Sequence, residues 1–167
     1  VTGVQTCALP IWVSTHFLVR RDGELVQFVP VGRRAWHAGA SSWQGETDTN
    51  SRSIGIEIQN PGHQIGYRDF PAVQMQSVVA LCRDILARHA IAPMNVLAHS
   101  DVAPGRKIDP GERFDWPLLF REGIGHWVPP AEADDLAQDA LAKAWKSRDS
   151  YQLGTNLKAW TFMILRN

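Results

Sequence analysis

One stretch, residues 97–116, constrains the fold of this chain more than any other. A short apolar run, Asn95–Ala98, leads into it and predicts a buried strand. Proline and glycine then recur, and they predict an ordered loop after the strand because these residues favour turns. The turn residues of the loop are Pro104, Gly105, Pro110 and Gly111. A loop that a rigid element holds in this way is suited to carry ligand-binding side chains.

Three side chains of this loop carry chemistry. His99 and Asp109 offer one nitrogen and one oxygen, which are donor atoms that zinc accepts. Lys107, two residues before Asp109, offers an ammonium group that can stabilise negative charge developing on a carbonyl oxygen. Spacing alone leaves two interpretations open. The loop is either a metal site or a plain polar loop in which His99 has ordinary hydrogen-bond partners.

The segment 13–30 predicts a β-hairpin. Its two β-rich runs, 13–20 and 24–30, flank Arg-Asp-Gly, and Gly23 can adopt the positive φ of a tight turn. His16 lies in the first run, where its spacing favours a packed strand histidine over a metal ligand.

The loop 34–45 is rich in aromatic and small residues, and His37 lies beside Trp36 in it. Its tryptophans, Trp36 and Trp43, either cover the edge of the core or provide stacking surfaces for a sugar or a peptide. The residues alone favour neither interpretation.

A short strand is predicted over 53–60, with Ile54, Ile56 and Ile58 on one face and Glu57 on the other. A carboxylate in such a strand is either a solvated surface charge or a group held rigidly for catalysis.

Helical spacing of apolar residues predicts a helix over 70–90, and a shorter helix is expected over 114–120. With 167 residues, 44% of them hydrophobic and 20% charged, the chain can bury one main core. The expected fold class is therefore α/β, with a mixed central β-sheet flanked by helices and a C-terminal helical appendage.

Four motifs resemble those of the type 2 N-acetylmuramoyl-L-alanine amidases, the AmpD-like group related to peptidoglycan recognition proteins. In chain order they are VSTHFLVRRDGELVQFVP, AWHAGASSWQGETDTN, SIGIEIQN and HSDVAPGRKIDPG. The resemblance covers residues 13–130. It implies a zinc hydrolase that cleaves the amide between N-acetylmuramic acid and L-alanine in peptidoglycan or muropeptides.

The resemblance also implies roles for single residues. The glutamate of the matching family motif is the catalytic acid and base, which assigns this role to Glu57, and Lys107 would stabilise the oxyanion. His99 and Asp109 would be zinc ligands.

Three further residues, Trp36, His37 and Asn50, fall on the substrate side of the cleft in this resemblance. His16 matches a family histidine that lies near the site without binding zinc. The remaining zinc ligand of the family is a histidine upstream of the part that matches Val13, and the sequence shows no counterpart. We therefore expect weak zinc binding and little amidase activity from this chain.

The N-terminal segment 1–12 reads as an artefact, because 1–11 lack strand or helix periodicity and resemble the translation of a sequencing adapter. This interpretation predicts an N-terminally truncated amidase domain over 13–130. It places the true N-terminus, with any targeting signal, outside the sequence.

The composition changes after Pro129, and 131–167 predict a pair of helices, the first over 131–146 and the second from Leu157. This segment resembles part of region 2 of extracytoplasmic-function sigma factors. Either a misjoined reading frame or a genuine helical appendage would explain it.

Charge and composition limit the partners. Seventeen basic and seventeen acidic residues cancel, so we expect no nucleic acid partner for the amidase domain, and no apolar run is long enough to span a membrane. The two cysteines, Cys7 and Cys82, imply no disulfide framework. We expect a bacterial monomer of the periplasm or cytoplasm. A non-catalytic peptidoglycan-binding module and a sigma-factor fragment remain as alternatives.

Overall fold

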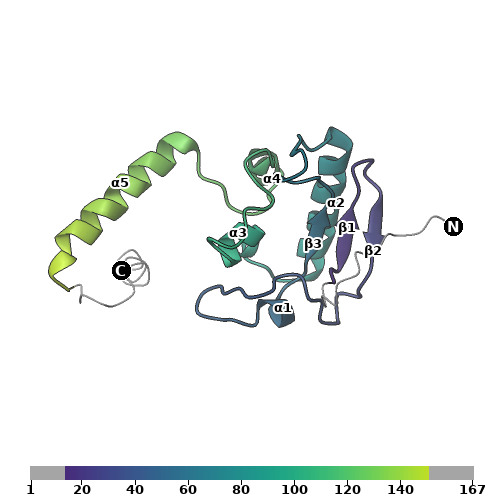
Figure 1. Ribbon diagram of the computed structural model, residues 1–167, viewed down its shortest axis with the longest axis horizontal. Coiled ribbons are helices and arrows are strands. Elements are labelled where there is room, and N and C mark those ends of the chain that lie inside the picture. The colour runs from purple at the N-terminus through teal and green to yellow at the C-terminus, as the bar shows by residue number, and fades with distance from the viewer. Residues whose placement is uncertain (1–13, 151–167) are drawn as a thin grey trace. The chain divides into compact units, whose positions relative to one another are not determined.

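The structure, a computed structural model, describes residues 14–150 (Figure 1). The described residues fall into two compact units that part between His126 and Trp127. The first unit holds a small sheet and its covering helices, and the second holds one long helix. The division into functional segments 1–12, 13–130 and 131–167 stays a prediction.

The first unit begins with the predicted hairpin. Strand β1 (Phe17–Val19) pairs antiparallel with β2 (Leu25–Gln27), so the hairpin is confirmed with shorter strands than the sequence suggested. Gly23 has a φ of 87°, and its N–H donates to the carbonyl of Arg20 over 2.9 Å. The turn therefore uses the conformational freedom for which glycine was singled out.

Strand β3 (Ile56–Ile58) lies parallel to β1 and completes a sheet of order β2-β1-β3 (Figure 1). The isoleucines of this segment, Ile54, Ile56 and Ile58, pack against the core. Glu57 is exposed, as the alternation predicted. The mixed sheet with flanking helices confirms the expected α/β fold class.

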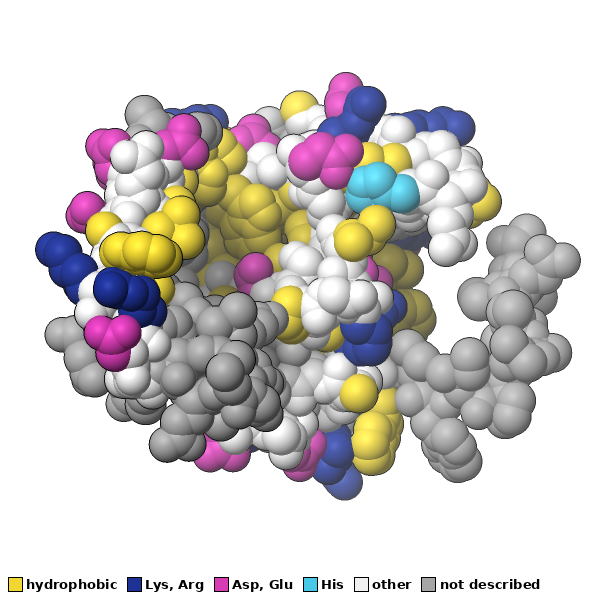
Figure 2. All heavy atoms as spheres, turned by 60° about the vertical axis from the view of Figure 1, so that its left-hand side comes forward, with side chains coloured by type: hydrophobic (Ala, Val, Ile, Leu, Met, Phe, Trp, Pro, Cys, Tyr) yellow, Lys and Arg dark blue, Asp and Glu magenta, His cyan; other side chains and the backbone are white. Residues whose placement is uncertain are grey.

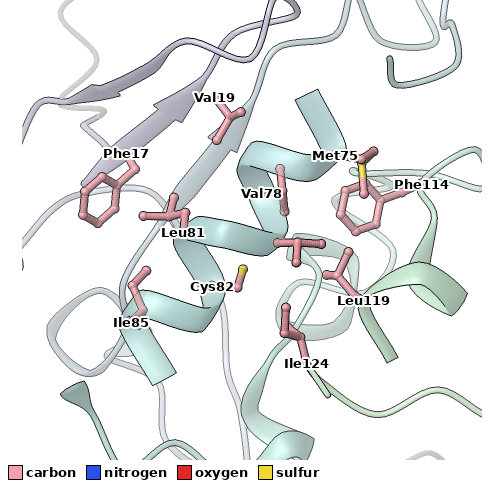
Figure 3. Packing of buried hydrophobic residues seen from close by; sticks show 11 residues of the cluster. Phe17, Val19, Met75, Val78, Leu81, Cys82, Ile85, Phe114, Leu119 and Ile124 are labelled. Carbon is pink, nitrogen blue, oxygen red and sulfur yellow. The ribbon is translucent and has the colours of Figure 1, made fainter. Parts of the chain in front are cut away.

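Helix α2 (Ala72–Arg88) supplies one wall of the core. Its apolar side chains face Phe17 and Val19 of β1, and Phe114, Leu119 and Ile124 close the cluster from the C-terminal side (Figure 3). Cys82 belongs to this cluster, and burial raises the pKa of its thiol to about 11. This cysteine is therefore a small buried hydrophobe.

The predicted strand over Asn95–Ala98 is wrong. Residues Pro93–Asn95 form the 3-10 helix η1, and the helix α3 (His99–Val102) begins directly at His99. The N–H of Val96 donates to the carbonyl of Pro93 over 3.1 Å, so it serves the turn and not a strand ladder. The extended backbone from Val96 to Ala98 therefore pairs with no strand of the described chain.

Two short helices complete the first unit. Helix α1 (Thr49–Arg52) precedes β3, and α4 (Trp116–Arg121) follows the loop that comes after α3. The side chain of Asp115 accepts a hydrogen bond from the N–H of Leu118 over 2.8 Å and caps α4, close to where the sequence predicted a helix.

The second unit contains α5 (Pro130–Lys146) and the 3-10 helix η2 (Arg148–Ser150). Helix α5 confirms the first predicted helix of the appendage, while the second, from Leu157, lies outside the described residues. Three large apolar side chains of α5 are exposed: Leu136, Leu141 and Trp145. Among residues 14–150, no helix combines the length and apolar character that crossing a bilayer requires.

Acidic and basic side chains lie close together on the face of the molecule that Figure 2 presents. This mixture agrees with the formal net charge of zero.

Candidate active site

The centre of the candidate site is a pair formed by His99 and Asp109. His99 Nδ1 lies 3.0 Å from Asp109 Oδ2. The N–H of Ser100 donates to the carbonyl of Asp109 over 3.1 Å, so a backbone bond brings the end of the loop back to its start. A second hydrogen bond holds the start of this segment, because the carboxylate of Asp101 accepts the N–H of Ala98 over 2.8 Å.

Each partner of this pair changes the protonation of the other. The hydrogen bond to Asp109 is the main cause that raises the pKa of His99, against the opposing effect of burial. The same bond lowers the pKa of Asp109. The charge of Lys107 lowers both pKa values as a minor cause.

The other side of the His99 ring faces a second loop. His99 Nε2 lies 3.0 Å from the carbonyl oxygen of Ala38. The guanidinium of Arg106 donates to the same oxygen over 2.7 Å and to the carbonyl of Ala40 over 3.0 Å. Sequence reasoning missed Arg106, although its place directly before Lys107 in the Pro/Gly-rich loop was a usable signal.

Asn50 is buried, with 6% of its surface exposed. Its side-chain oxygen accepts the N–H groups of His37 and Ala38 over 2.9 and 2.8 Å. The structure therefore gives Asn50 the task of holding a backbone turn. Its predicted contact with substrate stays a prediction.

Trp36 is 48% exposed, and the guanidinium of Arg34 lies 3.9 Å from the centroid of its ring. Arg34 also pairs with Asp48 at 2.8 Å. The ring of Trp36 is thus partly exposed next to the His37 turn, with the Arg34 guanidinium over it.

His37 packs its ring against Gly55, where an added Cβ would collide with the imidazole. Burial lowers the pKa of His37, and the neighbouring His16 lowers it further. The two rings meet edge to face with centroids 5.6 Å apart.

His16 is a packed histidine directly before β1, close to the strand position that its spacing favoured. Only 1% of its surface is exposed. Its Nδ1 accepts the N–H of Gly55 over 3.0 Å, and its Nε2 lies 2.9 Å from the carbonyl of Arg33. Both ring nitrogens of His16 therefore have hydrogen-bond partners in the fold.

Glu57 lies on the sheet face opposite the core and is exposed. Within residues 14–150 no hydrogen bond or ion pair joins it to His99, Lys107 or Asp109. The structure pairs His99, the first residue of α3, with Asp109 on the loop after α3, and Lys107 lies two residues before Asp109 on that loop. It leaves Glu57 on a neighbouring rigid element.

The described residues do not fit a complete zinc site. Two donors of a tetrahedral zinc ion, each about 2.1 Å from the metal, lie roughly 3.4 Å apart. His99 and Asp109 approach this arrangement at 3.0 Å, but no group of three His, Cys, Asp or Glu side chains in the described chain could hold a metal. Outside the described residues, Cys7 is the one side chain of these four types in the sequence.

A cavity of about 370 Å³ opens beside the same loop. It is lined by neighbours of His99 and Asp109 but by neither of these residues. The side chains around it include His63, Ser100, Ile108, Glu112 and Trp116.

The first unit is an α/β domain with a parallel strand pair and a covering helix. Its candidate site contains the hydrogen-bonded His99–Asp109 pair. Residues 4–112 match the family described as N-acetylmuramoyl-L-alanine amidase. This match covers more than half of the 167 residues, and the chain therefore belongs to the N-acetylmuramoyl-L-alanine amidase family. Residues 125–167 match the family described as Sigma-70 region 2.

The amidase match begins at residue 4, inside the segment that was interpreted as a translated adapter. The comparisons give that interpretation no support. The match to Sigma-70 region 2 agrees with the resemblance seen in the C-terminal segment.

The relatives are bacterial enzymes. The chain is 45% identical over 127 residues to N-acetylmuramoyl-L-alanine amidase AmiD of Escherichia coli, covering 69% of this chain and 46% of the relative. It is 46% identical over 105 residues to 1,6-anhydro-N-acetylmuramyl-L-alanine amidase AmpD of Salmonella typhimurium, covering 63% and 54%. The chain thus spans about half the length of these curated relatives.

Solved structures agree with the fold. The AmiD structure from Escherichia coli, a complex with the substrate anhydro-N-acetylmuramic acid-L-Ala-D-γ-Glu-L-Lys, has a TM-score of 0.67 at 40% identity and covers 76% of this chain and 55% of that chain. AmpDh3 from Pseudomonas aeruginosa has a TM-score of 0.71 at 30% identity, covering 91% and 64%.

Proposed function

We propose that the first unit carries the site of an amidase that hydrolyses the bond between N-acetylmuramic acid and L-alanine in peptidoglycan or muropeptides. One observation carries the proposal: His99 and Asp109, which match the family motif, are paired at 3.0 Å, and Lys107 of the same motif lies two residues before Asp109 on the loop after α3. The similarity to AmiD, whose structure holds a muropeptide substrate, supports the substrate class.

Two residues would carry the chemistry. Glu57 would accept a proton from the attacking water while the water oxygen bonds to the amide carbon. The ammonium of Lys107 would stabilise the negative oxygen of the tetrahedral intermediate. Glu57 would then pass the proton to the departing nitrogen of L-alanine as the carbon–nitrogen bond breaks.

Zinc is the metal that we propose for His99 and Asp109, because an imidazole nitrogen and a carboxylate oxygen suit this ion. Catalytic zinc sites use three protein ligands, and the described residues supply two. We therefore propose that turnover by this chain is low.

On the substrate side, the exposed ring of Trp36 is proposed as a stacking surface for the muropeptide. His37 and Asn50 would shape the adjacent turn and line the cleft. We propose that the chain acts as a monomer.

Turnover of anhydro-N-acetylmuramic acid-L-Ala-D-γ-Glu-L-Lys, followed by mass spectrometry with zinc in excess, tests the proposed function. We expect slow release of the free peptide, reduced at least about a hundredfold by Glu57→Ala and by Lys107→Ala. A matched control is Glu46→Ala. Glu46 is also an exposed carboxylate, and it forms an ion pair with Arg52 over 2.9 Å instead of contacting the His99–Asp109 pair. Equal turnover in wild type and Glu57→Ala would show that the role of Glu57 is wrong.

The incomplete ligand set favours one second candidate, a module that binds peptidoglycan without cleaving it. Calorimetric binding of the same muropeptide without any product after long incubation would support this candidate. Product formation that depends on Glu57 would exclude it.

A further inference from the structure

We propose that Arg106 is a positioning residue that holds the tryptophan loop, defined as residues 36–43, against the His99–Asp109 pair. The inference deepens the proposed function and rests on it, because the tryptophan loop is the proposed substrate side of the cleft. Arg106 lies on the loop that carries Lys107 and Asp109, so one side chain joins the two halves of the site.

The guanidinium of Arg106 donates hydrogen bonds to two carbonyl groups of the tryptophan loop. Its Nη2 donates to Ala38 over 2.7 Å, and its Nε donates to Ala40 over 3.0 Å. A planar fork with donors in fixed directions can span two acceptors in this way, whereas the three donors of a lysine ammonium rotate and have no fixed directions.

Gly39, between the two gripped carbonyls, allows this approach. It has a φ of 60°, and an added Cβ would lie 3.3 Å from Arg106 Nη2. The turn therefore presents both carbonyls to the guanidinium with no side chain between them.

The same contacts reach the His99–Asp109 pair. The carbonyl of Ala38 that Arg106 holds lies 3.0 Å from His99 Nε2, and Arg106 Nη2 itself lies 3.4 Å from that nitrogen. Asn50 holds the N–H of Ala38 over 2.8 Å. The residue beside the His99 ring is thus fixed at its N–H by Asn50 and at its carbonyl by Arg106.

Two other hydrogen bonds hold the C-terminal end of the tryptophan loop. The N–H of Ser42 donates to the carbonyl of Val102 over 2.8 Å, and the indole N–H of Trp43 donates to Asn95 over 3.0 Å. Arg106 holds the part between these fastenings and His37, so its loss should release the loop locally without opening the core.

Amide hydrogen exchange by NMR, together with calorimetric binding of anhydro-N-acetylmuramic acid-L-Ala-D-γ-Glu-L-Lys, tests the inference on three variants. Arg106→Ala removes the grip, and Arg106→Lys keeps the charge without the fork. The matched control is Arg21→Ala, because Arg21 also donates to a backbone carbonyl, that of Asp69 over 3.2 Å, away from the tryptophan loop.

We expect exchange of the Ala38 and Ser42 amides to become at least about tenfold faster in both Arg106 variants, as for local opening of a loop. The Kd for the muropeptide should rise at least about fivefold in both, because the loop must then be ordered on binding. The Arg21→Ala variant should leave both quantities unchanged. A purely structural role would affect the melting temperature without this selective change of the Kd.

Unchanged exchange in Arg106→Ala, full rescue by lysine, or faster exchange with an unchanged Kd would each overturn the positioning role. If the wild-type chain binds no muropeptide, the proposed function fails. The exchange rates then still show whether Arg106 holds the loop, so the two failures are distinguishable.

Discussion

The substitution Asn50→Ala tests how the tryptophan loop is built. Asn50 is 6% exposed, and one side-chain oxygen accepts two backbone N–H groups, those of His37 and Ala38, over 2.9 and 2.8 Å. Alanine provides no acceptor, so both N–H groups lose this partner.

The expected cost follows from the two orphaned donors. A buried donor that loses its partner costs about 1–3 kcal/mol, so two such groups cost about 2–6 kcal/mol if water does not reach them. Partial entry of water at this loop lowers the expectation to about 3 kcal/mol. For a unit of roughly a hundred residues this loss corresponds to a fall in melting temperature of about 12–24 °C.

Urea unfolding followed by circular dichroism measures this loss. The matched control is Asn60→Ala, because the side-chain oxygen of Asn60 also accepts two backbone N–H groups, over longer distances of 3.2 and 3.4 Å and nearer the solvent. We expect the control to cost less than half as much. A loss below about 1 kcal/mol in Asn50→Ala, or equal losses in the two variants, would refute the reasoning.

Two further predictions concern pH and the C-terminal unit. The pKa of His99 is raised above 6.5, so its contribution to stability is full below pH 6.5 and is lost as the pH rises through the raised value. The pKa of Asp109 is lowered below 3.8, so its contribution is present above pH 3.8 and is lost as the pH falls through the lowered value. Asp109→Asn should therefore lower the free energy of unfolding most at pH values between the two pKa values, by under about 1 kcal/mol because the pair is partly exposed. A loss that urea unfolding shows to be independent of pH would contradict the assignment. Deletion of residues 131–167 should shift the melting temperature of the first unit by less than about ten degrees, because the two units part between His126 and Trp127. A larger fall, measured by calorimetry, would show that the C-terminal segment stabilises the first unit.

Local patterns in the sequence predicted most of the fold. Gly23 between two β-rich runs predicted the hairpin, and the alternation of Ile54, Ile56 and Ile58 predicted both the strand and the exposed face of Glu57. These features depend on neighbours in the sequence, so composition and periodicity carry them. Helix α2 was predictable for the same reason, and it begins at Ala72 with Pro71 as its cap.

The strand predicted over Asn95–Ala98 failed for a different reason. An apolar run becomes a strand only when a neighbour offers free hydrogen-bonding groups, and this depends on tertiary structure. Pro93 instead starts a 3-10 turn, which takes up the N–H of Val96. Periodicity contains no information on that competition.

The site was predicted by motif rather than by geometry. The resemblance named His99 and Asp109, and the structure places them 3.0 Å apart. It did not reveal that Asn50 turns its oxygen toward the backbone or that Arg106 grips two carbonyls 66 and 68 residues earlier in the chain. Contacts over such separations appear only when the loops are placed in space.

The central claim is the proposal that His99 and Asp109 bind zinc without a third ligand among residues 14–150. Calorimetric titration of the purified chain with zinc tests it most directly. We predict weak binding, with a Kd above about 1 μM, because two donors fix neither the affinity nor the geometry of a complete site. Stoichiometric binding with a Kd of about 1 nM, abolished by His37→Ala or His16→Ala, would contradict the account and identify the third ligand.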